Sequence, residues 1–271
     1  SYPQYGDWIG AYDATVADFY ETVPVKYGWC DDSINSDYQS SGSGTLRFNM
    51  TNLRGPIGFY YFKDSIGHNK QRMNVSAVNL TFHNNNEQLR PRVVPTGNTN
   101  TYTIVWSSYS NTQPVIKWST TEAGLATASQ ISGSLDRIAQ DELCGAPANT
   151  YGWRDMGQIN YADMSGMDAL AGTKIYYTFG DAASDTWSSR NWEFYIPPAK
   201  GTQPTGRGTS LVLFDDLGRG SNDDAFTWEH YGRPSYNTTV RVGHLISTGA
   251  VDAVYHGGDI SYAVGYEAVW D

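Results

Sequence analysis

A succession of short β-prone segments, each bounded by turn-forming residues, constrains what this 271-residue chain can fold into. Near the start they cover residues 6–12, 44–50 and 57–62, which are aromatic or β-branched and are separated by Gly, Asn or Ser. Segments of this length and spacing are typical of antiparallel β-sandwiches. We therefore predict a mainly β protein that begins with a β-sandwich, with its last strand within residues 74–83.

Two proline-containing stretches divide the chain into three parts. Residues 91–100 combine two prolines with turn residues, and residues 197–206 are rich in Pro and Gly and show no periodicity. Both compositions are typical of boundaries between domains. Between them lie further short β-prone segments, at residues 102–107, 115–119, 173–179 and 192–196. We predict a first β-sandwich over residues 1–90, a second over residues 91–205, and a third part over residues 206–271.

The third part has a different pattern. Residues 210–214 form a continuous apolar run, which predicts a strand buried on both faces. Residues 237–239 offer an N-cap for an amphipathic helix that ends near Gly249, and residues 251–256 predict a second buried strand. Strand, helix and strand form a βαβ unit, which begins an α/β domain. Because this part is too small to cover both faces of its strands, we expect it to require further chain or a partner subunit.

Acidic residues follow both predicted strands. Asp215 and Asp216 follow the first, and Asp259 and Tyr262 follow the second. Side chains beyond the carboxyl ends of parallel strands meet at one edge of the sheet, and converging oxygen ligands are typical of a hard-metal site. Because a phenol ionises only near a pKa of about 10, a tyrosine ligand favours a trivalent ion such as Fe(III). Each motif alone is more typical of an ordinary turn, but their order, with a helix between them, predicts a metal site that acts on phosphate esters.

The charge of the chain excludes several classes of protein. With 18 basic and 28 acidic residues the formal net charge is −10, and the isoelectric point is about 4.8. Nucleic-acid polymers require a basic surface, and no Lys/Arg run is present. No apolar stretch approaches the ~20 residues that span a bilayer. We therefore expect neither nucleic-acid nor membrane partners.

Composition indicates a secretory route to an extracellular or cell-wall location. Charged residues make up 17% of the chain, below the roughly 25% of an ordinary domain. Residues 1–4 lack signal-peptide features, so we expect that any secretion signal has been removed. Cys30 and Cys144 could form one disulfide or could be two unrelated thiols, and both alternatives stay open. Four N-x-S/T sequons predict glycosylation, at Asn49, Asn74, Asn79 and Asn237.

Motifs along the whole chain point to one family. They are Asp7-Trp8-Ile9-Gly10, Cys144-Gly145-Ala146-Pro147-Ala148, Gly152-Trp153-Arg154-Asp155, Asp216-Leu217-Gly218, Gly220-Ser221-Asn222, Asn237-Thr238-Thr239, His256, Gly258-Asp259-Ile260-Ser261-Tyr262-Ala263 and Trp270-Asp271. With them the sequence resembles the large, plant-type purple acid phosphatases, a metallophosphoesterase branch sometimes described as nucleotide pyrophosphatase/phosphodiesterase-like. The resemblance implies two β-sandwiches, the second fibronectin-III-like, followed by the start of an α/β metallophosphoesterase domain.

The same resemblance implies a dinuclear centre of Fe(III) with a divalent Zn, Mn or Fe. Asp216 would bind the ferric ion, Asp259 would bridge the two metals, and Tyr262 would be the phenolate that gives the purple colour. The implied reaction is hydrolysis of phosphate monoesters, or of nucleotide phosphodiesters and pyrophosphates. A phosphate ester is therefore the expected substrate.

Two departures from the family pattern qualify this expectation. Asp215 stands where the family has Gly, which adds bulk and negative charge beside a ligand. The family's Gly-Asn-His motif and its two later His-containing motifs do not occur, so the catalytic residues stay unknown and we expect little hydrolysis by these 271 residues alone. A missing C-terminal portion or homo-oligomerisation would complete the protein. The alternative function is a non-catalytic secreted glycoprotein whose β-sandwich modules serve interaction or structural roles.

Overall fold

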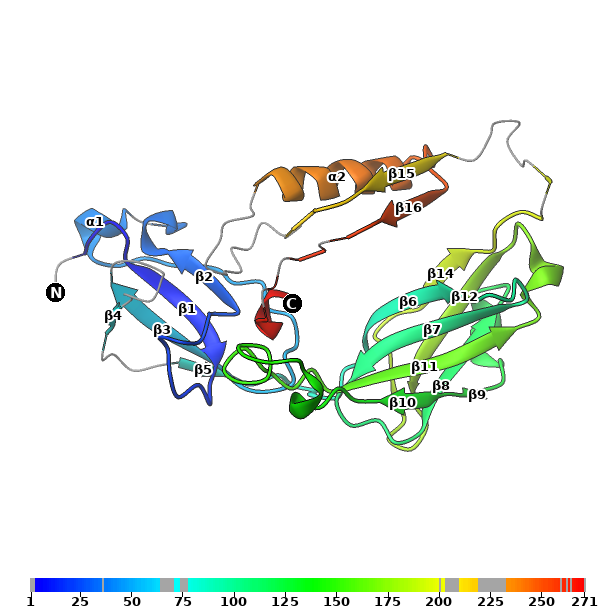
Figure 1. Cartoon of the computed structure of the whole chain (residues 1–271), viewed down its shortest axis with the longest axis horizontal. Coiled ribbons are helices and arrows are strands. Elements are labelled where there is room, and N and C mark those ends of the chain that lie inside the picture. The colour runs from blue at the N-terminus through cyan, green and yellow to red at the C-terminus, as the bar shows by residue number, and fades with distance from the viewer. Residues whose placement is uncertain are drawn as a thin grey trace. The chain divides into compact units, whose positions relative to one another are not determined.

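A computed structural model of the chain is mainly β, with several antiparallel sheets (Figure 1). It describes residues 3–35, 37–63, 71–73, 78–199, 201–202, 210–218, 233–258, 260–261, 263 and 265–270. Two compact units are present. The first contains Ser1–Phe82, Gln140–Arg154 and Thr209–Asp271, and the second contains His83–Ala139 and Asp155–Gly208. These units differ from the three consecutive parts expected from the sequence, because distant segments pack together within each unit.

The first unit is built on a five-stranded antiparallel sheet with the order β2-β1-β3-β4, in which β5 also pairs with β3. The bounds are β1 (Trp8–Asp13), β2 (Lys26–Trp29), β3 (Ile57–Lys63), β4 (Gln71–Arg72) and β5 (Val78–Leu80). The two strands predicted over residues 6–12 and 57–62 are therefore confirmed. The described residues of this segment form one sheet rather than the two facing sheets of the predicted sandwich.

Aromatic side chains stabilise one side of this sheet. Trp8 and Phe62 are fully buried and stack with their ring centroids 4.2 Å apart. The guanidinium of Arg72 lies 4.6 Å from the ring centroid of Phe19, a cation–π contact at the edge of the same cluster. Stacked aromatic pairs stabilise a core beyond the area that they bury. Alternating residues thus bury this face as the β-pattern requires.

The predicted strand over residues 44–50 does not form. Its side chains alternate in burial, with Leu46 and Phe48 half-buried and Arg47 exposed, but no ladder of hydrogen bonds joins the segment to the sheet. Leu46 and Phe48 instead pack over Gly28 of β2, where a glycine leaves room for them. An alternating pattern indicates an extended segment that is buried on one face. Whether such a segment pairs with a sheet depends on whether a free strand edge lies within hydrogen-bonding distance of its backbone. Short helices η1 (Cys30–Asp32) and α1 (Tyr38–Ser41) precede this segment.

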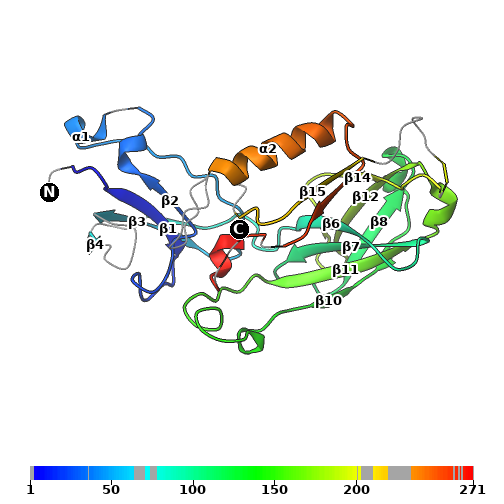
Figure 2. The same cartoon turned by 45° about the horizontal axis from the view of Figure 1, so that its top comes forward.

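The second unit is a sandwich of two antiparallel sheets, in which strands of one sheet lie opposite strands of the other (Figures 1 and 2). Their orders are β10-β11-β7-β6 and β13-β12-β8-β9, with β14 paired to β12. The bounds are β6 (Leu89–Pro95), β7 (Thr101–Ser108), β8 (Pro114–Ser119), β9 (Ile131–Ser132), β10 (Ser134–Asp136), β11 (Gln158–Ser165), β12 (Lys174–Asp181), β13 (Thr186–Trp187) and β14 (Trp192–Tyr195). All four strands predicted between residues 102 and 196 are confirmed.

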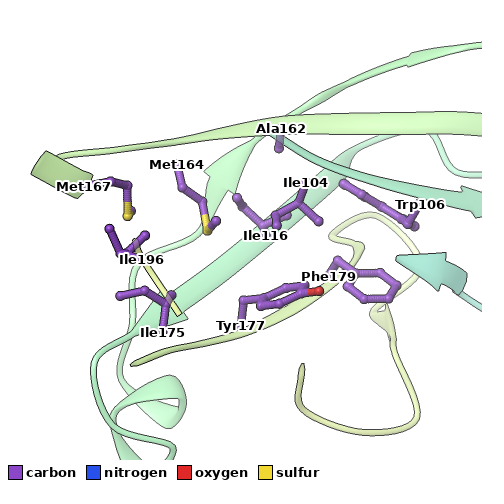
Figure 3. Packing of buried hydrophobic residues seen from close by; sticks show 10 residues of the cluster. All are labelled: Ile104, Trp106, Ile116, Ala162, Met164, Met167, Ile175, Tyr177, Phe179 and Ile196. Atoms are coloured by element: carbon purple, nitrogen blue, oxygen red, sulfur yellow. The ribbon is translucent and has the colours of Figure 1, made fainter. Parts of the chain in front are cut away.

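The core of the second unit lies between its two sheets. Figure 3 shows Ile104 and Trp106 of β7 opposite Tyr177 and Phe179 of β12. These side chains are at most 3% exposed, because successive residues of each strand alternate between the core and the outer face. Two short 3₁₀ turns lie in this unit, η2 (Ala123–Ala126) and η4 (Met167–Leu170). A further turn, η3 (Gln140–Glu142), belongs to the first unit.

Strand, helix and strand form as predicted in the last part of the chain. Strand β15 (Leu211–Phe214) pairs in parallel with β16 (Ala253–His256), and helix α2 (Arg233–Ser247) runs alongside both (Figures 1 and 2). The helix begins four residues before Asn237, so the predicted N-cap at residues 237–239 was wrong. Pro234 lies in its first turn, where a missing N–H removes no helical hydrogen bond. No helix in the described part of the chain is long and apolar enough to cross a membrane.

The two parallel strands are not buried on both faces, contrary to the sequence prediction. Leu211, Leu213 and Tyr255 are 55%, 66% and 62% exposed. The register pairs Leu211 with Ala253 and Leu213 with Tyr255, so these side chains share one face of the sheet. A continuous apolar run is typical of a strand that other elements cover on both faces. Whether the strand is buried depends on whether those elements are present.

The segment after β16 packs against the first unit. Tyr266 and Ala263 are buried with Val23, and the Tyr266 hydroxyl donates to the Glu21 carbonyl at 3.3 Å. Glu267, at the start of η5 (Glu267–Trp270), forms a largely buried ion pair with Arg154 at 3.5 Å. A Cβ at Gly152 would collide with the carbonyl of Gly265, so a glycine is required there. Gly152 and Arg154, which belong to one of the family-like motifs, thus contact Gly265 and Glu267.

Candidate metal centre

The carboxyl ends of β15 and β16 lie side by side. Phe214 and His256 are register partners at the ends of these strands, and the Gly257 amide donates to the Phe214 carbonyl at 3.0 Å. Beyond the strands, the Asp216 amide donates to the Gly258 carbonyl at 3.1 Å. The backbone of Asp216 is therefore hydrogen bonded to the residue that directly precedes Asp259 in the sequence.

Of the three predicted ligands, the structure describes Asp216. Asp259 and Tyr262 lie outside the described residues, as do Asp223 and Asp224. Asp216 has a backbone φ of 52°, a left-handed conformation that Asp adopts more readily than most residues. Both Asp215 and Asp216 are exposed, which is compatible with access by a cation from solvent.

Asp215 takes up the space beside the second strand end. A Cβ added to Gly257 would collide with the Asp215 carboxylate, so any larger residue at position 257 would require the Asp215 side chain to move. A second carboxylate thus lies within van der Waals reach of the β16 end. The departure from the family's Gly at position 215 therefore has a visible consequence, because it places an extra negative charge at the sheet edge that carries Asp216.

His256 combines packing with an unmet hydrogen bond. Its ring packs against that of Phe214, with the two ring centroids 4.6 Å apart. Its Nε2 atom is buried and has no hydrogen-bond partner in the described part of the chain, and the same holds for the Ser261 hydroxyl. Buried polar atoms usually find a partner. A hydrogen-bonding role for His256 was not predicted from the sequence. Its position at the end of a predicted strand was the signal that could have indicated such a role.

The donor type at this edge fits a hard cation, because carboxylate oxygens are the ligands that such ions prefer. The number of donors is smaller than a metal pair requires. Among the described residues no group of three His, Cys, Asp or Glu side chains is close enough to hold a metal ion. Of the three predicted ligands, the described residues therefore include Asp216.

The remaining predicted sites are distributed over the surface and the core. Cys30 is buried and Cys144 is exposed, and both are free thiols, so the structure forms no disulfide between them. Among the sequons, Asn49, Asn79 and Asn237 are exposed, whereas Asn74 lies outside the described residues. An exposed Asn is what glycosylation requires. Asn237 is exposed within helix α2, not at its start.

Comparison with known proteins covers almost the whole chain. No family model matches it. Two curated relatives from Arabidopsis thaliana, named "Probable inactive purple acid phosphatase 27" and "Probable inactive purple acid phosphatase 1", are 29% and 28% identical, each over 99% of this chain and 45% of the relative. This chain is homologous to the N-terminal part of plant purple acid phosphatases. It spans less than half the length of these relatives.

A solved structure agrees with this relationship at the level of the fold. A purple acid phosphatase from yellow lupin (Lupinus luteus) seeds matches 99% of this chain and 48% of its own chain, with a TM-score of 0.81 and 24% sequence identity. The mainly β architecture is therefore that of the N-terminal region of a purple acid phosphatase. The resemblance inferred from the motifs is confirmed, and two of the homologues are named as probably inactive.

Proposed function

We propose that this chain is the N-terminal part of a metal-dependent acid phosphatase that hydrolyses phosphate monoesters. In this proposal Asp216, Asp259 and Tyr262 are ligands of an Fe(III) ion paired with a divalent Zn, Mn or Fe. The hydrogen bond between the Asp216 amide and the Gly258 carbonyl carries the proposal, because it brings the two strand ends that bear these residues together. Homology to purple acid phosphatases supports the same assignment.

The residues of this chain would act mainly by positioning ligands. The parallel pairing of β15 with β16 sets the separation of the two strand ends, and Gly257 leaves room for the Asp215 carboxylate between them. When bound, such a metal pair supplies Lewis-acid stabilisation of the phosphate ester and activates the attacking water. Because the net charge of −10 repels phosphate esters, affinity for the substrate would depend on the bound cations.

The proposal extends to the architecture and the partners. The sandwich of the second unit would be the fibronectin-III-like domain, and β15, α2 and β16 would be the first βαβ portion of the metallophosphoesterase domain. Leu211, Leu213 and Tyr255 form an exposed apolar face. This face supports the proposal that a further element covers it, either the rest of a longer protein or a second copy of the chain. The exposed sequons support a secreted, extracellular or cell-wall glycoprotein.

The test uses the longest product of the gene, purified and analysed for iron and zinc. We expect bound metal, a visible charge-transfer band and phosphate release from 4-nitrophenyl phosphate. Tyr262→Phe should remove the band, whereas Tyr255→Phe, which changes an exposed tyrosine on β16, should leave it unchanged. An inactive protein without metal would refute the proposal. Strong hydrolysis by the 271-residue chain alone would refute the ligand assignment.

A second candidate is a non-catalytic glycoprotein that serves interaction or structural roles. The Asp215 carboxylate at the edge of the predicted centre favours it, as do the printed names of the Arabidopsis relatives. The Asp215→Gly variant of the longest product separates the two candidates. Under the first, metal occupancy stays the same or rises when the extra charge is removed. Absence of metal from both proteins would establish the second.

A further inference from the structure

The first unit contains a cavity that the proposed phosphatase function does not use. Its volume is about 650 Å³, within the range of small-molecule sites. One wall is the outer face of the sheet, with Ile9 of β1 and Phe59 of β3, and the opposite wall is the unpaired segment that carries Leu46, Phe48 and Met50. The rings of Phe48 and Phe59 lie 5.3 Å apart. The cavity therefore offers a mostly apolar, aromatic lining.

Two tyrosine hydroxyls form the polar end of this cavity. Tyr38 of α1 and Tyr61 of β3 both line it, and their Oη atoms are 2.8 Å apart. Each hydroxyl lies within hydrogen-bond distance of Asp7 Oδ2, at 2.7 Å for Tyr38 and 2.6 Å for Tyr61. A phenol carries a single hydrogen, so when both hydroxyls donate to Asp7 only their acceptor lone pairs remain for a ligand. This end of the cavity accepts hydrogen bonds.

Asp7 is a buried charge directly behind the two hydroxyls. Its side chain is fully buried, and its Oδ1 atom has no hydrogen-bond partner in the described part of the chain. Burial by itself raises the pKa of Asp7, but the hydrogen bonds from Tyr61, Tyr38 and the Gln4 amide and the charge of Lys63 outweigh it, so the pKa lies below its ordinary value. Asp7 is therefore ionised at neutral pH.

The electrostatic effect of the Asp7 charge reaches the lining of the cavity. Burial raises the pKa of the Cys30 thiol to about 12, and the charges of Asp7 and Asp31 add to the effect. Burial also raises the pKa of Tyr38 to about 12, with a further contribution from Asp7. Arg47 is a cation that lines the cavity, but its side chain is exposed to solvent, which screens its charge. The buried end of the cavity thus favours a positive charge.

We propose that this cavity binds a small organic ammonium ion with an aromatic or aliphatic body. The ammonium group would donate hydrogen bonds to the hydroxyl oxygens of Tyr38 and Tyr61, and its charge would be balanced by Asp7 one hydrogen bond away. The apolar body would lie against the side chains of Leu46, Phe48 and Phe59, which line the cavity. Charge-assisted hydrogen bonds at the polar end and burial of the apolar body both stabilise such a complex.

The test is isothermal titration calorimetry of the 271-residue chain at neutral pH with three probes that share a phenyl ring and a short chain. They are 2-phenylethylammonium, 2-phenylethanol and 3-phenylpropanoate. We expect the ammonium ion to bind at least tenfold more tightly than the alcohol or the carboxylate. Equal affinity for the three probes, or tighter binding of the carboxylate through Arg47, would overturn the proposal, and so would the absence of binding by the ammonium ion.

Variants locate the bound ion. Tyr61→Phe keeps the ring but removes one acceptor, and about tenfold weaker binding is expected, the usual loss for a hydrogen bond to a charged group. Asp7→Asn should weaken binding of the ammonium ion and leave that of the alcohol unchanged. Tyr60→Phe is the matched control, because Tyr60 lies on the other face of β3 within the aromatic cluster. If Asp7→Asn does not fold, Tyr61→Phe decides, and wild-type affinity in that variant would contradict the assignment.

Discussion

The sandwich of the second unit depends on a buried polar network centred on Gln88, which is 3% exposed. Gln88 Oε1 accepts from the indole N–H of Trp106 and from Asn111 Nδ2, both at 2.8 Å. Gln88 Nε2 donates to Asn111 Oδ1 at 2.9 Å and to the Asn86 carbonyl at 2.8 Å. Gln88→Met keeps the length of the side chain and removes all four hydrogen bonds. We predict that it destabilises the second unit substantially.

The size of the loss in unfolding free energy follows from the groups that lose a hydrogen-bond partner in Gln88→Met. Asn111 keeps hydrogen bonds to Asn160 at 3.2 Å and to Asn86 at 3.1 Å, so it loses only part of its hydrogen bonding. The Trp106 N–H is left unpaired in a residue that is 1% exposed. An unpaired buried polar group costs about 1–3 kcal/mol, so the two losses together amount to about 3 kcal/mol. For a domain of about 100 residues this corresponds to a decrease in Tm of roughly 10 °C or more.

Differential scanning calorimetry of the whole chain measures this decrease. The transition of the second unit must be assigned separately, because the two units need not unfold together. Gln113→Met is the control, since the Gln113 side chain is exposed and its backbone amide alone donates to Asp181. We expect the control to change stability by less than about 0.5 kcal/mol. If Gln88→Met and Gln113→Met shift Tm equally, the argument from the buried network is refuted.

Two further predictions concern acid stability and burial. Burial alone raises the pKa of Asp181, but hydrogen bonds from the amides of Gln113, Thr112 and Ser184 and from the Ser184 hydroxyl outweigh it, so the folded-state pKa is lowered. The stability that the ionised Asp181 contributes is present above the unfolded-state pKa of about 4 and is lost as pH falls through the folded-state pKa. In wild-type protein the free energy of unfolding in urea should therefore fall below about pH 5, and in Asp181→Asn this fall should be smaller. The same pH profile in both proteins would contradict this. Ile175→Ala, at a fully buried position, should cost about 3 kcal/mol in urea unfolding, and Leu213→Ala, at a position 66% exposed, less than about 1 kcal/mol. Equal costs would show that Leu213 is covered in solution.

Much of the secondary structure could be predicted from the sequence. The segments near Ile104, Ile116, Ile175 and Phe194 form strands as expected, because alternating apolar residues between turn residues report burial on a pleated surface. The start of helix α2 was missed because residues 237–239 have good capping side chains, while the Pro in the first turn was the better signal. The segment with Leu46 and Phe48 shows that alternation alone does not establish pairing.

The parallel strand pair next to the candidate metal centre was predictable. Acids that follow two consecutive buried strands meet at one edge only if the strands pair in parallel, and the register of Phe214 with His256 meets that condition. The collision that an Asp215 carboxylate would impose on any side chain at Gly257 could not be predicted, because it depends on the separation of the two strand ends. The unpaired Nε2 of His256 was equally invisible, since hydrogen-bond partners depend on three-dimensional neighbours.

The sequence by itself determined many of the strands, the order strand, helix and strand near the end, and the relationship to purple acid phosphatases. Local patterns of apolar and turn residues suffice to predict such features, because each pattern lies within a few neighbouring positions of the sequence. Only the tertiary structure decided that Asp7 is buried behind Tyr61, 54 residues away, and that Gln88 and Asn111 pair 23 residues apart. The physical reason is that burial and hydrogen bonding join residues distant in the chain, so the cavity of the first unit and the polar core of the second exist only once the sheets have assembled.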